Sequence, residues 1–262
     1  MFFDLNVPGS RSEEERARVR KRASQLGWHC IATTTTYKGE SLKRPPQEGS
    51  PETGLQGFAL GSDGSADAEA DLIELSRIHL DGSHIEDNVS LIPKCRKAYD
   101  LVSCRPTSEE SFRKICTLVD CDIVSLDLSQ PLPFRIAPSH AQAALKRGLV
   151  FEITYSNLLL DDSLRKNVFC NARALCRCTR GKGIVISSGT RSALDLRSPL
   201  DVVNIGTLFN LKEKQAREAL DANCLGLVER AANAKTFTKG FCLREEANES
   251  VQDKYKVKRR KC

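Results

Sequence analysis

Short apolar runs alternate with helical patterns along most of this chain. The first run, residues 2–7, is followed by Ser12 and Glu15, whose spacing is that of a helix capping box. Apolar residues then recur at helical spacing as far as Gly27, and glycine commonly ends helices. Residues 30–36 are rich in β-branched side chains, which favour strands. The first 36 residues therefore predict a strand, a helix and a second strand.

The same alternation resumes at residue 72. Five further apolar runs have the length of strands, at residues 72–80, 101–104, 123–128, 150–155 and 184–187. Helical signals lie between these runs. They are a capping-box pattern at residues 107–110, a short helix from Pro138 to Gly148, apolar helical spacing from Val168 to Gly181, and a helix start at Ser198 and Pro199.

Strands that alternate with helices form parallel sheets with right-handed crossovers. About seven such units close most simply into a barrel, so we expect an α/β fold with a TIM-like parallel barrel. The alternative is a doubly wound open sheet, which usually carries a glycine-rich phosphate loop, whereas residues 6–10 contain one glycine. Residues 211–220 predict a further amphipathic helix, and residues 222–228 fit either its continuation or a final strand.

Two segments fall outside this pattern. Residues 37–71 are rich in Gly, Pro, Ser and acidic residues and lack an apolar period, so we expect a disordered insertion there. Residues 243–262 form a tail with a basic end, whose cations are Lys254, Lys256, Lys258, Arg259, Arg260 and Lys261. We therefore expect one barrel domain built from residues 1–36 and 72–242.

The charge and cysteine content narrow the range of partners and compartments. The chain has 40 basic and 34 acidic residues, and the six cations of the tail account for the whole excess. A polyanion would therefore bind to a local patch plus the tail rather than to a uniformly positive surface. Eleven cysteines without a CxxC pair indicate a reducing compartment. No apolar run approaches the ~20 residues that span a bilayer, so no membrane association is expected.

Several stretches together resemble one known family. They are residues 3–6 (FDLN), 99–102 (YDLV), 123–128 (IVSLDL), 132–134 (LPF), 147–153 (RGLVFEI), 181–188 (GKGIVISS) and 201–206 (DVVNIG). Their order and spacing are similar to protein component three of eukaryotic and archaeal ribonuclease P, which eukaryotes share with ribonuclease MRP. The resemblance covers most of residues 1–36 and 72–242.

This resemblance implies a TIM-like barrel related to the polymerase and histidinol phosphatase (PHP) hydrolases. It implies a protein subunit with no catalytic site and no cofactor of its own, in a particle whose RNA removes the 5′ leader of precursor tRNA with Mg²⁺ held chiefly by that RNA. The implied partners are the catalytic RNA of ribonuclease P and MRP, precursor tRNA, a small ferredoxin-like protein subunit and the other subunits of the particle. The implied location is the nucleus, and within it the nucleolus.

A metal centre is the main alternative to a non-catalytic barrel. Where the related hydrolases place paired histidines, this chain has Asp4-Leu-Asn6, and its four histidines are scattered along the sequence. Asp4, Asp127 and Glu152 lie on different predicted strands, so they either converge on Mg²⁺, as in a stand-alone PHP-like metallophosphoesterase, or form internal hydrogen bonds. Cys170, Cys176 and Cys178 do not share a helical face, so we expect no zinc site there.

The candidates for RNA contact are mostly basic residues. Lys94, Arg96, Lys97 and Arg105 flank one predicted strand, and Arg177, Arg180 and Lys182 follow one predicted helix, whose dipole also favours cations at its end. Ser187 and Ser188 form a turn suited to phosphate binding, with Arg191 and Arg197 close behind. The six cations of the tail fit RNA contact or nuclear import, and a protein-binding adaptor whose tail only directs import is a third hypothesis.

Overall fold

Seven parallel strands form the centre of the described structure, a computed structural model that describes residues 1–9, 12–37, 72–82, 91–160, 162–190, 192–238 and 241–242. The strands are β1 (Phe3–Pro8), β2 (Cys30–Thr36), β3 (Ile73–Asp81), β4 (Leu101–Arg105), β5 (Ile123–Ser125), β6 (Val150–Thr154) and β7 (Ile184–Ser187). They pair in chain order, each parallel to the next. The expected disordered insertion and basic tail lie outside the described residues, apart from Tyr37.

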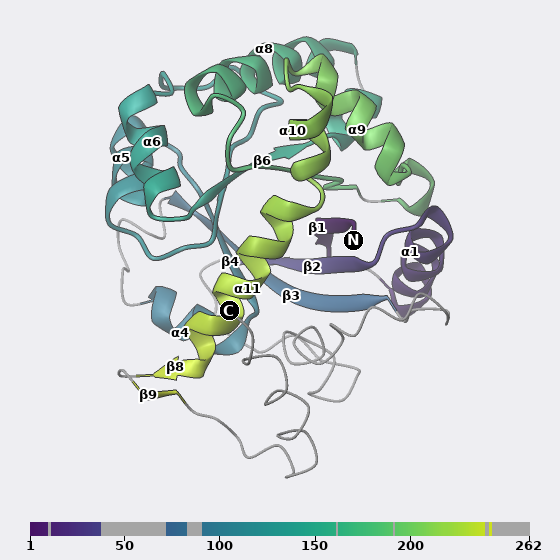
Figure 1. Cartoon of the computed structure of the whole chain (residues 1–262). Helices are drawn as coiled ribbons and strands as arrows, with labels where there is room; N and C mark the ends of the chain where they lie inside the picture. The colour runs from purple at the N-terminus through teal and green to yellow at the C-terminus, as the bar shows by residue number, and fades with distance from the viewer. Residues whose placement is uncertain are drawn as a thin grey trace, which may run out of the picture.

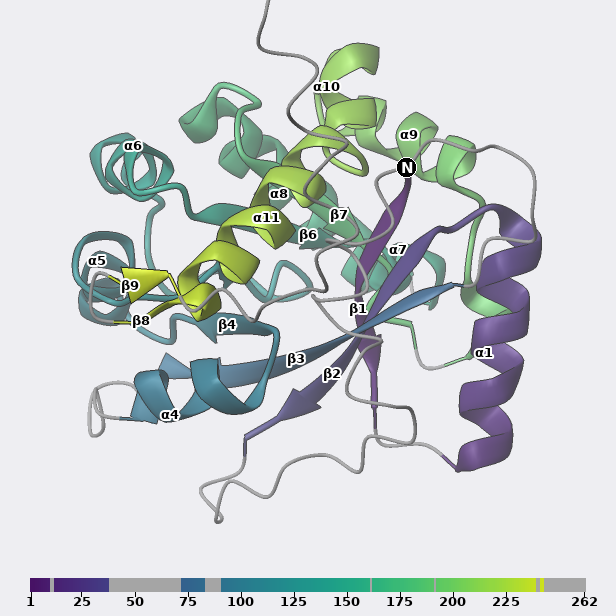
Figure 2. The same cartoon turned by 60° about the horizontal axis from the view of Figure 1, so that its bottom comes forward.

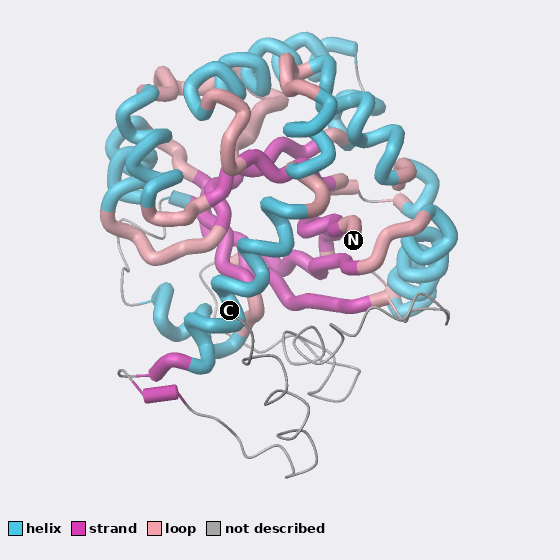
Figure 3. Tube along the Cα trace, in the orientation of Figure 1, coloured by secondary structure: helices cyan, strands magenta, loops and turns pink. Residues whose placement is uncertain are grey.

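Helices surround the ring of strands, as Figure 3 shows. They are α1 (Glu13–Leu26), α4 (Leu91–Ala98), α5 (Glu109–Thr117), α6 (Pro138–Lys146), α7 (Ser156–Leu160), α8 (Asp162–Thr179), η1 (Ala193–Asp195), α9 (Pro199–Leu208), α10 (Glu213–Glu218) and α11 (Ala222–Thr236). A short hairpin, β8 (Phe237–Thr238) and β9 (Phe241–Cys242), follows α11. Two views show α1 and α6 on opposite sides of the strands (Figures 1 and 2). The TIM-like α/β barrel expected from the sequence is confirmed.

The helix boundaries follow from local capping. The Ser12 side chain accepts a hydrogen bond from the Glu15 backbone, and Gly27 ends α1 in the left-handed conformation at φ 87°. Pro138 opens α6, and the Ser198 side chain caps α9, both as predicted. The capping box predicted at residues 107–110 is shifted by one position, because α5 begins at Glu109 and its cap is formed by Ser108 and Ser111.

Several segments differ from the sequence prediction. The strand predicted at residues 123–128 ends at Ser125, and the helix predicted at residues 211–220 spans only Glu213–Glu218. Residues 222–228 belong to α11, which decides between the two alternatives left open. The basic segment ahead of β4 forms a helix, α4, that no sequence signal had indicated.

The last helix closes one end of the barrel. Figure 1 shows α11 running across the ring of strands. Its buried residues Cys224, Leu227 and Val228 join a cluster with inward-facing residues at the strand starts, among them Phe3 and Leu101. This end of the interior is therefore apolar, because α11 excludes water from it. The polar inward-facing side chains lie in the carboxyl-terminal half of the strands.

The seam between β7 and β1 has no strand ladder among the described residues and is closed by other contacts. At the amino end, the backbone N–H groups of Phe3 and Ile186 donate to the carbonyls of Leu220 and Ala219, at 3.0 and 3.2 Å. At the carboxyl end, the Gly189 N–H donates to the Asn6 carbonyl at 2.9 Å. The residues just before α11 therefore partly replace the eighth strand of a closed barrel.

None of the described helices combines the length and the apolar character that crossing a membrane requires.

Candidate functional site

A buried ion pair occupies the interior of the barrel. The Arg77 guanidinium donates to both carboxylate oxygens of Glu152, at 2.5 and 2.6 Å, and neither side chain has any exposed surface. Arg77 lies on β3 and Glu152 on β6, so the pair spans the barrel. A two-point contact of this kind is among the strongest charge-assisted hydrogen bonds.

Hydroxyl and backbone groups satisfy the rest of this pair. Ser125 and Ser187 donate to the two oxygens of Glu152 at 2.6 and 2.7 Å. Arg77 also donates to the Ser103 hydroxyl at 2.9 Å and to the Leu5 carbonyl at 2.7 Å. Burial alone would raise the pKa of Glu152, but the charge of Arg77 and these hydrogen bonds outweigh it and lower the pKa to about 2. Glu152 is therefore ionised at neutral pH.

Asp4 is buried beside this network, at the seam of the barrel. One of its carboxylate oxygens accepts hydrogen bonds from the backbone N–H groups of Ser188 at 2.9 Å and Asn6 at 3.3 Å. The other oxygen has no hydrogen-bond partner among the described residues. Burial raises the pKa of Asp4 to about 6 in spite of the lowering effect of these hydrogen bonds. Asp4 therefore joins β1 to the end of β7 and carries a charge that its surroundings disfavour.

The mouth at the carboxyl ends of the strands carries charges that are already paired. The Arg105 guanidinium lies 3.5 Å from Asp81 and 3.9 Å from Asp127, and all three side chains are partly exposed. His79 shares a hydrogen bond with the Ser103 hydroxyl at 3.1 Å. Burial, followed by the nearby charge of Arg77, lowers the pKa of His79 to about 4, so its ring is neutral at pH 7.

The three carboxylates considered for Mg²⁺ are used separately. Glu152 is bound by Arg77, Asp4 by backbone amides, and Asp127 by both the N–H and the hydroxyl of Ser129. No cluster of three metal-ligating side chains occurs among the described residues. Among the described residues the three carboxylates therefore make separate hydrogen bonds, which is the second of the two alternatives considered from the sequence. The structural reason is that a guanidinium group already occupies the space between the strands.

The three closely spaced cysteines face different surroundings. Cys170 is exposed, Cys176 is buried, and Cys178 is hydrogen-bonded through its thiol to the Ile136 carbonyl at 3.3 Å. Burial raises the pKa of the Cys176 thiol to about 12, which keeps it protonated.

The predicted RNA contacts that flank β4 have different surroundings in the structure. Arg96 is only 15% exposed and bridges Asp120 and Asp122 at 3.1 and 3.2 Å, so it supports the fold. Arg105 is held between two acidic residues, as described above. Lys94 and Lys97 lie exposed on α4. Two of the four cations are therefore available at the surface without a competing acidic partner among the described residues.

The predicted serine turn is internal, which corrects its assignment as a phosphate site. Ser187 and Ser188 have no exposed surface. The Ser187 hydroxyl donates to Glu152, and the Ser188 hydroxyl donates to the Asn6 carbonyl at 3.2 Å. A phosphate cannot reach these hydroxyls, because the seam contacts of β1 and β7 cover them.

The remaining predicted contacts are exposed or lie outside the described residues. Arg177, Arg180, Lys182 and Arg197 are exposed. The backbone of Arg197 is fixed, because its N–H donates to the Tyr155 hydroxyl and its carbonyl accepts from the Trp28 indole. The predicted contacts outside the described residues are Arg191, Lys254, Lys256, Lys258, Arg259, Arg260 and Lys261.

The sequence interpretation missed Arg77, although a signal was present. Leu75, Arg77 and His79 alternate along β3 on the inward face, and Glu152 has the corresponding position on β6. A charged residue on the buried phase of a strand needs a charged or polar partner on another strand. The pairing itself could not be read from the sequence, because it depends on how the barrel closes.

Fold and interior together define a parallel α/β barrel whose core contains a salt bridge between β3 and β6. The family model for RNase P subunit p30 matches residues 1–236, and the chain belongs to this family.

Individual proteins are similar to this chain in sequence or in fold. Ribonuclease P protein subunit p30 of Mus musculus is 33% identical over 236 residues, which are 90% of this chain and 87% of the mouse protein. Protein GAMETOPHYTE DEFECTIVE 1 of Arabidopsis thaliana is 37% identical over 143 residues, 55% of this chain but only 25% of that longer protein. A chain in a cryo-EM structure of archaeal ribonuclease P with mature tRNA has the same fold, with a TM-score of 0.66, 16% identity, and coverage of 93% of this chain and 100% of that one.

Proposed function

We propose that this chain is a non-catalytic protein subunit of ribonuclease P, which supports RNA-catalysed removal of the 5′ leader from precursor tRNA. The family match establishes the kind of protein. The observation that carries the non-catalytic role is the Arg77–Glu152 pair, which fills the barrel interior with groups that are already bonded to each other. In TIM barrels the catalytic groups extend from strand ends into open space at the carboxyl face, where they can reach a substrate.

The proposal includes the partners and the setting expected from the resemblance. The chain would bind the catalytic RNA of ribonuclease P, and that of ribonuclease MRP, together with a small ferredoxin-like protein subunit, and would contribute to the handling of precursor tRNA. The Mg²⁺ needed for cleavage would be held chiefly by the RNA, with no cofactor on this protein. The location would be the nucleus, and within it the nucleolus.

The candidate RNA contacts are reduced by the geometry. Lys94, Lys97 and Arg197 are exposed, and together with the cations at the end of α8 they remain candidates. Arg96, Ser187 and Ser188 are no longer candidates for RNA contact. Arg96 bridges two acidic residues, and both serines are buried. The basic tail remains a proposed RNA contact or import signal.

Affinity capture from nuclei tests the proposal. We expect the full chain to recover a structured non-coding RNA together with cleavage of the 5′ leader from precursor tRNA, and nuclease treatment should abolish that cleavage. Recovery of protein alone at low salt would contradict the proposal. Removal of residues 254–262 separates the roles of the tail, because an import signal alone would leave RNA recovery from extract unchanged.

A further inference from the structure

The outer face of α8 carries a row of exposed cations. Lys166, Cys170, Arg173, Arg177 and Arg180 are exposed and follow one another at steps of four, three, four and three residues. Residues at this spacing lie one above another on the same helix face. From Lys166 to Arg177 the row extends over about 16 Å along the helix, at a rise of 1.5 Å per residue, and Arg180 follows directly after the helix end, with a φ of 57°. Figure 1 shows α8 at the outer rim of the molecule, on the side away from α4. We call Lys166, Arg173, Arg177 and Arg180 the α8 row.

The α8 row has no acidic partner among the described residues. Residues 163–182 contain six basic residues and no acidic one. The nearest acidic residue before them in the described chain, Asp162, pairs with Arg165 at 2.9 Å. The positive potential along this helix is therefore not neutralised locally, and it would attract a polyanion.

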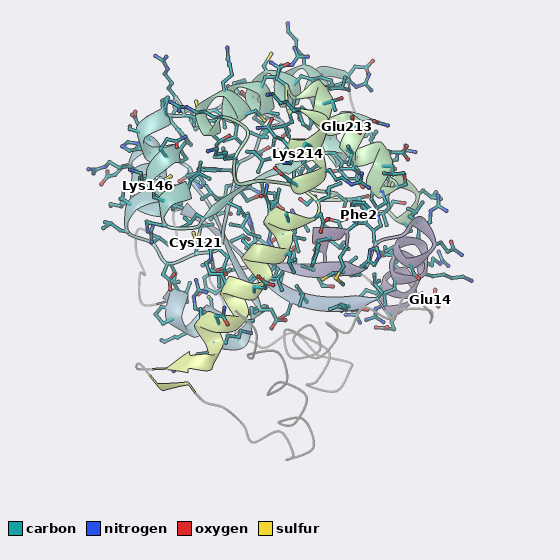
Figure 4. The ribbon with its side chains drawn as sticks, in the orientation of Figure 1. Phe2, Glu14, Cys121, Lys146, Glu213 and Lys214 are labelled. Carbon is teal, nitrogen blue, oxygen red and sulfur yellow. The ribbon has the colours of Figure 1, made fainter. Side chains whose placement is uncertain are left out.

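The other highly basic helix, α1, has a different arrangement. It begins with Glu13, Glu14 and Glu15. Arg16 and Arg18 pair with acidic residues of the same helix, and Arg20 pairs with both Glu13 and Glu74 of β3. Glu14 lies at the outer edge of α1, on the opposite side of Figure 4 from the helices around Lys146. Three cations of α1 are therefore paired with acidic residues, whereas no member of the α8 row is paired among the described residues.

The helix dipole does not account for the α8 row. Cations near the carboxyl end of a helix are favoured by the dipole, which explains Arg177 and Arg180. Lys166 lies in the first half of α8, where the dipole gives a cation no advantage. Arg173 is anchored, since its Nε donates to the Leu208 carbonyl at 3.0 Å and its guanidinium lies 5.8 Å from the centre of the Phe169 ring.

We propose that the α8 row binds the sugar–phosphate backbone of RNA; this rests on the proposed function. A regular row of unpaired cations matches the repeated charges of a nucleic-acid strand, and three of its four members are arginines, whose planar fork suits phosphate oxygens. Phe169 is half-buried beneath Arg173, so it is not free to stack on a base. Contact through phosphates rather than bases follows, and an acidic protein partner is the alternative outcome of the test.

Two variants of equal charge provide the test. The first is Lys166→Gln with Arg177→Gln and Arg180→Gln; it spares Arg173, which bonds to α9. The second is Arg18→Gln with Lys21→Gln and Arg22→Gln on α1, and it removes the same charge from another exposed helix face. Thermal unfolding confirms that both fold. The RNA captured with the wild-type chain serves as the probe for all three purified proteins.

The measured quantity is the slope of log affinity against log salt concentration. Each phosphate contact contributes about 0.7–0.9 to this slope, so we expect the α8 variant to lower it by about two and the α1 variant to leave it unchanged. Cys170 also provides a position for a thiol-directed photo-crosslinker within the row, with Cys170→Ser as its blank. Crosslinks from Cys170 in the assembled particle should reach RNA, and Arg18→Cys in the Cys170→Ser background should not.

The outcomes separate the two proposals. If the wild-type chain captures RNA but both charge variants have the same salt slope, or if Cys170 crosslinks only to protein, the role of the α8 row is overturned and the proposed function stands. If the wild-type chain captures no RNA from nuclei, both are overturned.

Discussion

The Arg77 guanidinium and the Glu152 carboxylate meet across the barrel at 2.5 and 2.6 Å, joining β3 to β6 through the interior. Two strands, β4 and β5, separate them along the sheet. Their contact therefore links opposite walls rather than neighbours. Because both are fully buried, each side chain needs the charge of the other to offset the cost of removing it from water.

Removal of one partner should be strongly destabilising. We expect Glu152→Gln or Arg77→Met to lower the free energy of unfolding by about 3–5 kcal/mol, because a buried charge is left without its partner. Urea unfolding at pH 7 measures the change. The exposed pair Arg18–Glu14, at 4.0 Å, is the control, and Glu14→Gln should cost about 0.5 kcal/mol or less.

The double variant Arg77→Met with Glu152→Leu should recover most of the loss, since apolar replacement of a whole buried pair is often neutral. Equal instability of the double and the single variants would show that the serine network, rather than the charge pair, dominates.

Stability should depend on pH in two windows of opposite sign. The folded pKa of Glu152, about 2, lies below its ordinary value of 4.5, so its contribution is present above pH 4.5 and is lost as the pH falls toward 2. The folded pKa of Asp4, about 6, lies above its ordinary value of 3.8, so its contribution is present below pH 4 and is lost as the pH rises to 6. Across the second window, the contribution of Asp4 to the free energy of unfolding changes by about 3 kcal/mol.

The variant Asp4→Asn isolates the second window. It can still accept the hydrogen bond from the Ser188 N–H through its carbonyl oxygen, but it does not titrate. The lowered pKa of His79 makes stability rise with pH in the same window, so the quantity to compare is the difference between the two proteins. We expect the stability of Asp4→Asn relative to the wild type to increase between pH 4 and 6 in urea titrations. A difference that is constant over this range would mean that Asp4 does not titrate there.

Two helical glycines should respond to alanine in opposite directions. A Cβ at Gly206 on α9 would lie 2.8 Å from the Ala216 Cβ and 3.0 Å from the Ile186 side chain, so Gly206→Ala should cost about 1–3 kcal/mol. Gly226 on α11 has nothing within 4 Å of such a Cβ, so Gly226→Ala should stabilise by about 0.5–1 kcal/mol. Thermal unfolding of both variants tests the close approach of α9 to α10, and equal shifts would refute it.

Metal removal should leave the protein unchanged. Since a salt bridge rather than a metal ion joins the walls of the barrel, we expect the same melting temperature before and after dialysis against EDTA. A reversible fall of several degrees, restored by Zn²⁺ or Mn²⁺, would instead support the stand-alone metallophosphoesterase.

Local sequence patterns predicted most of the fold. Strands such as Cys30–Thr36 and Ile184–Ser187, and caps such as Ser12 and Ser198, depend on a few adjacent residues, and the structure has them where the sequence placed them. The helix α4 was missed, because its short apolar face is visible only beside the strand that it covers.

The candidate site was predicted only in part. Exposure of cations such as Arg177 agrees with the sequence, whereas the burial of Ser187 and Ser188 and the ion pairs of Arg96 do not follow from it. Whether a polar residue at a strand end faces water or a neighbouring strand depends on contacts between distant parts of the chain.

The sequence by itself therefore determined the order of the strands and of most helices, the barrel they form and the family to which the chain belongs, because hydrophobic period, capping and motif order are properties of neighbouring residues. Only the tertiary structure decided that Arg77 meets Glu152, that Asp4 closes the seam and that the α8 row has no acidic partner among the described residues. These features depend on residues that are far apart in the sequence. Their free energies depend on burial and distance, which are fixed only when the barrel closes.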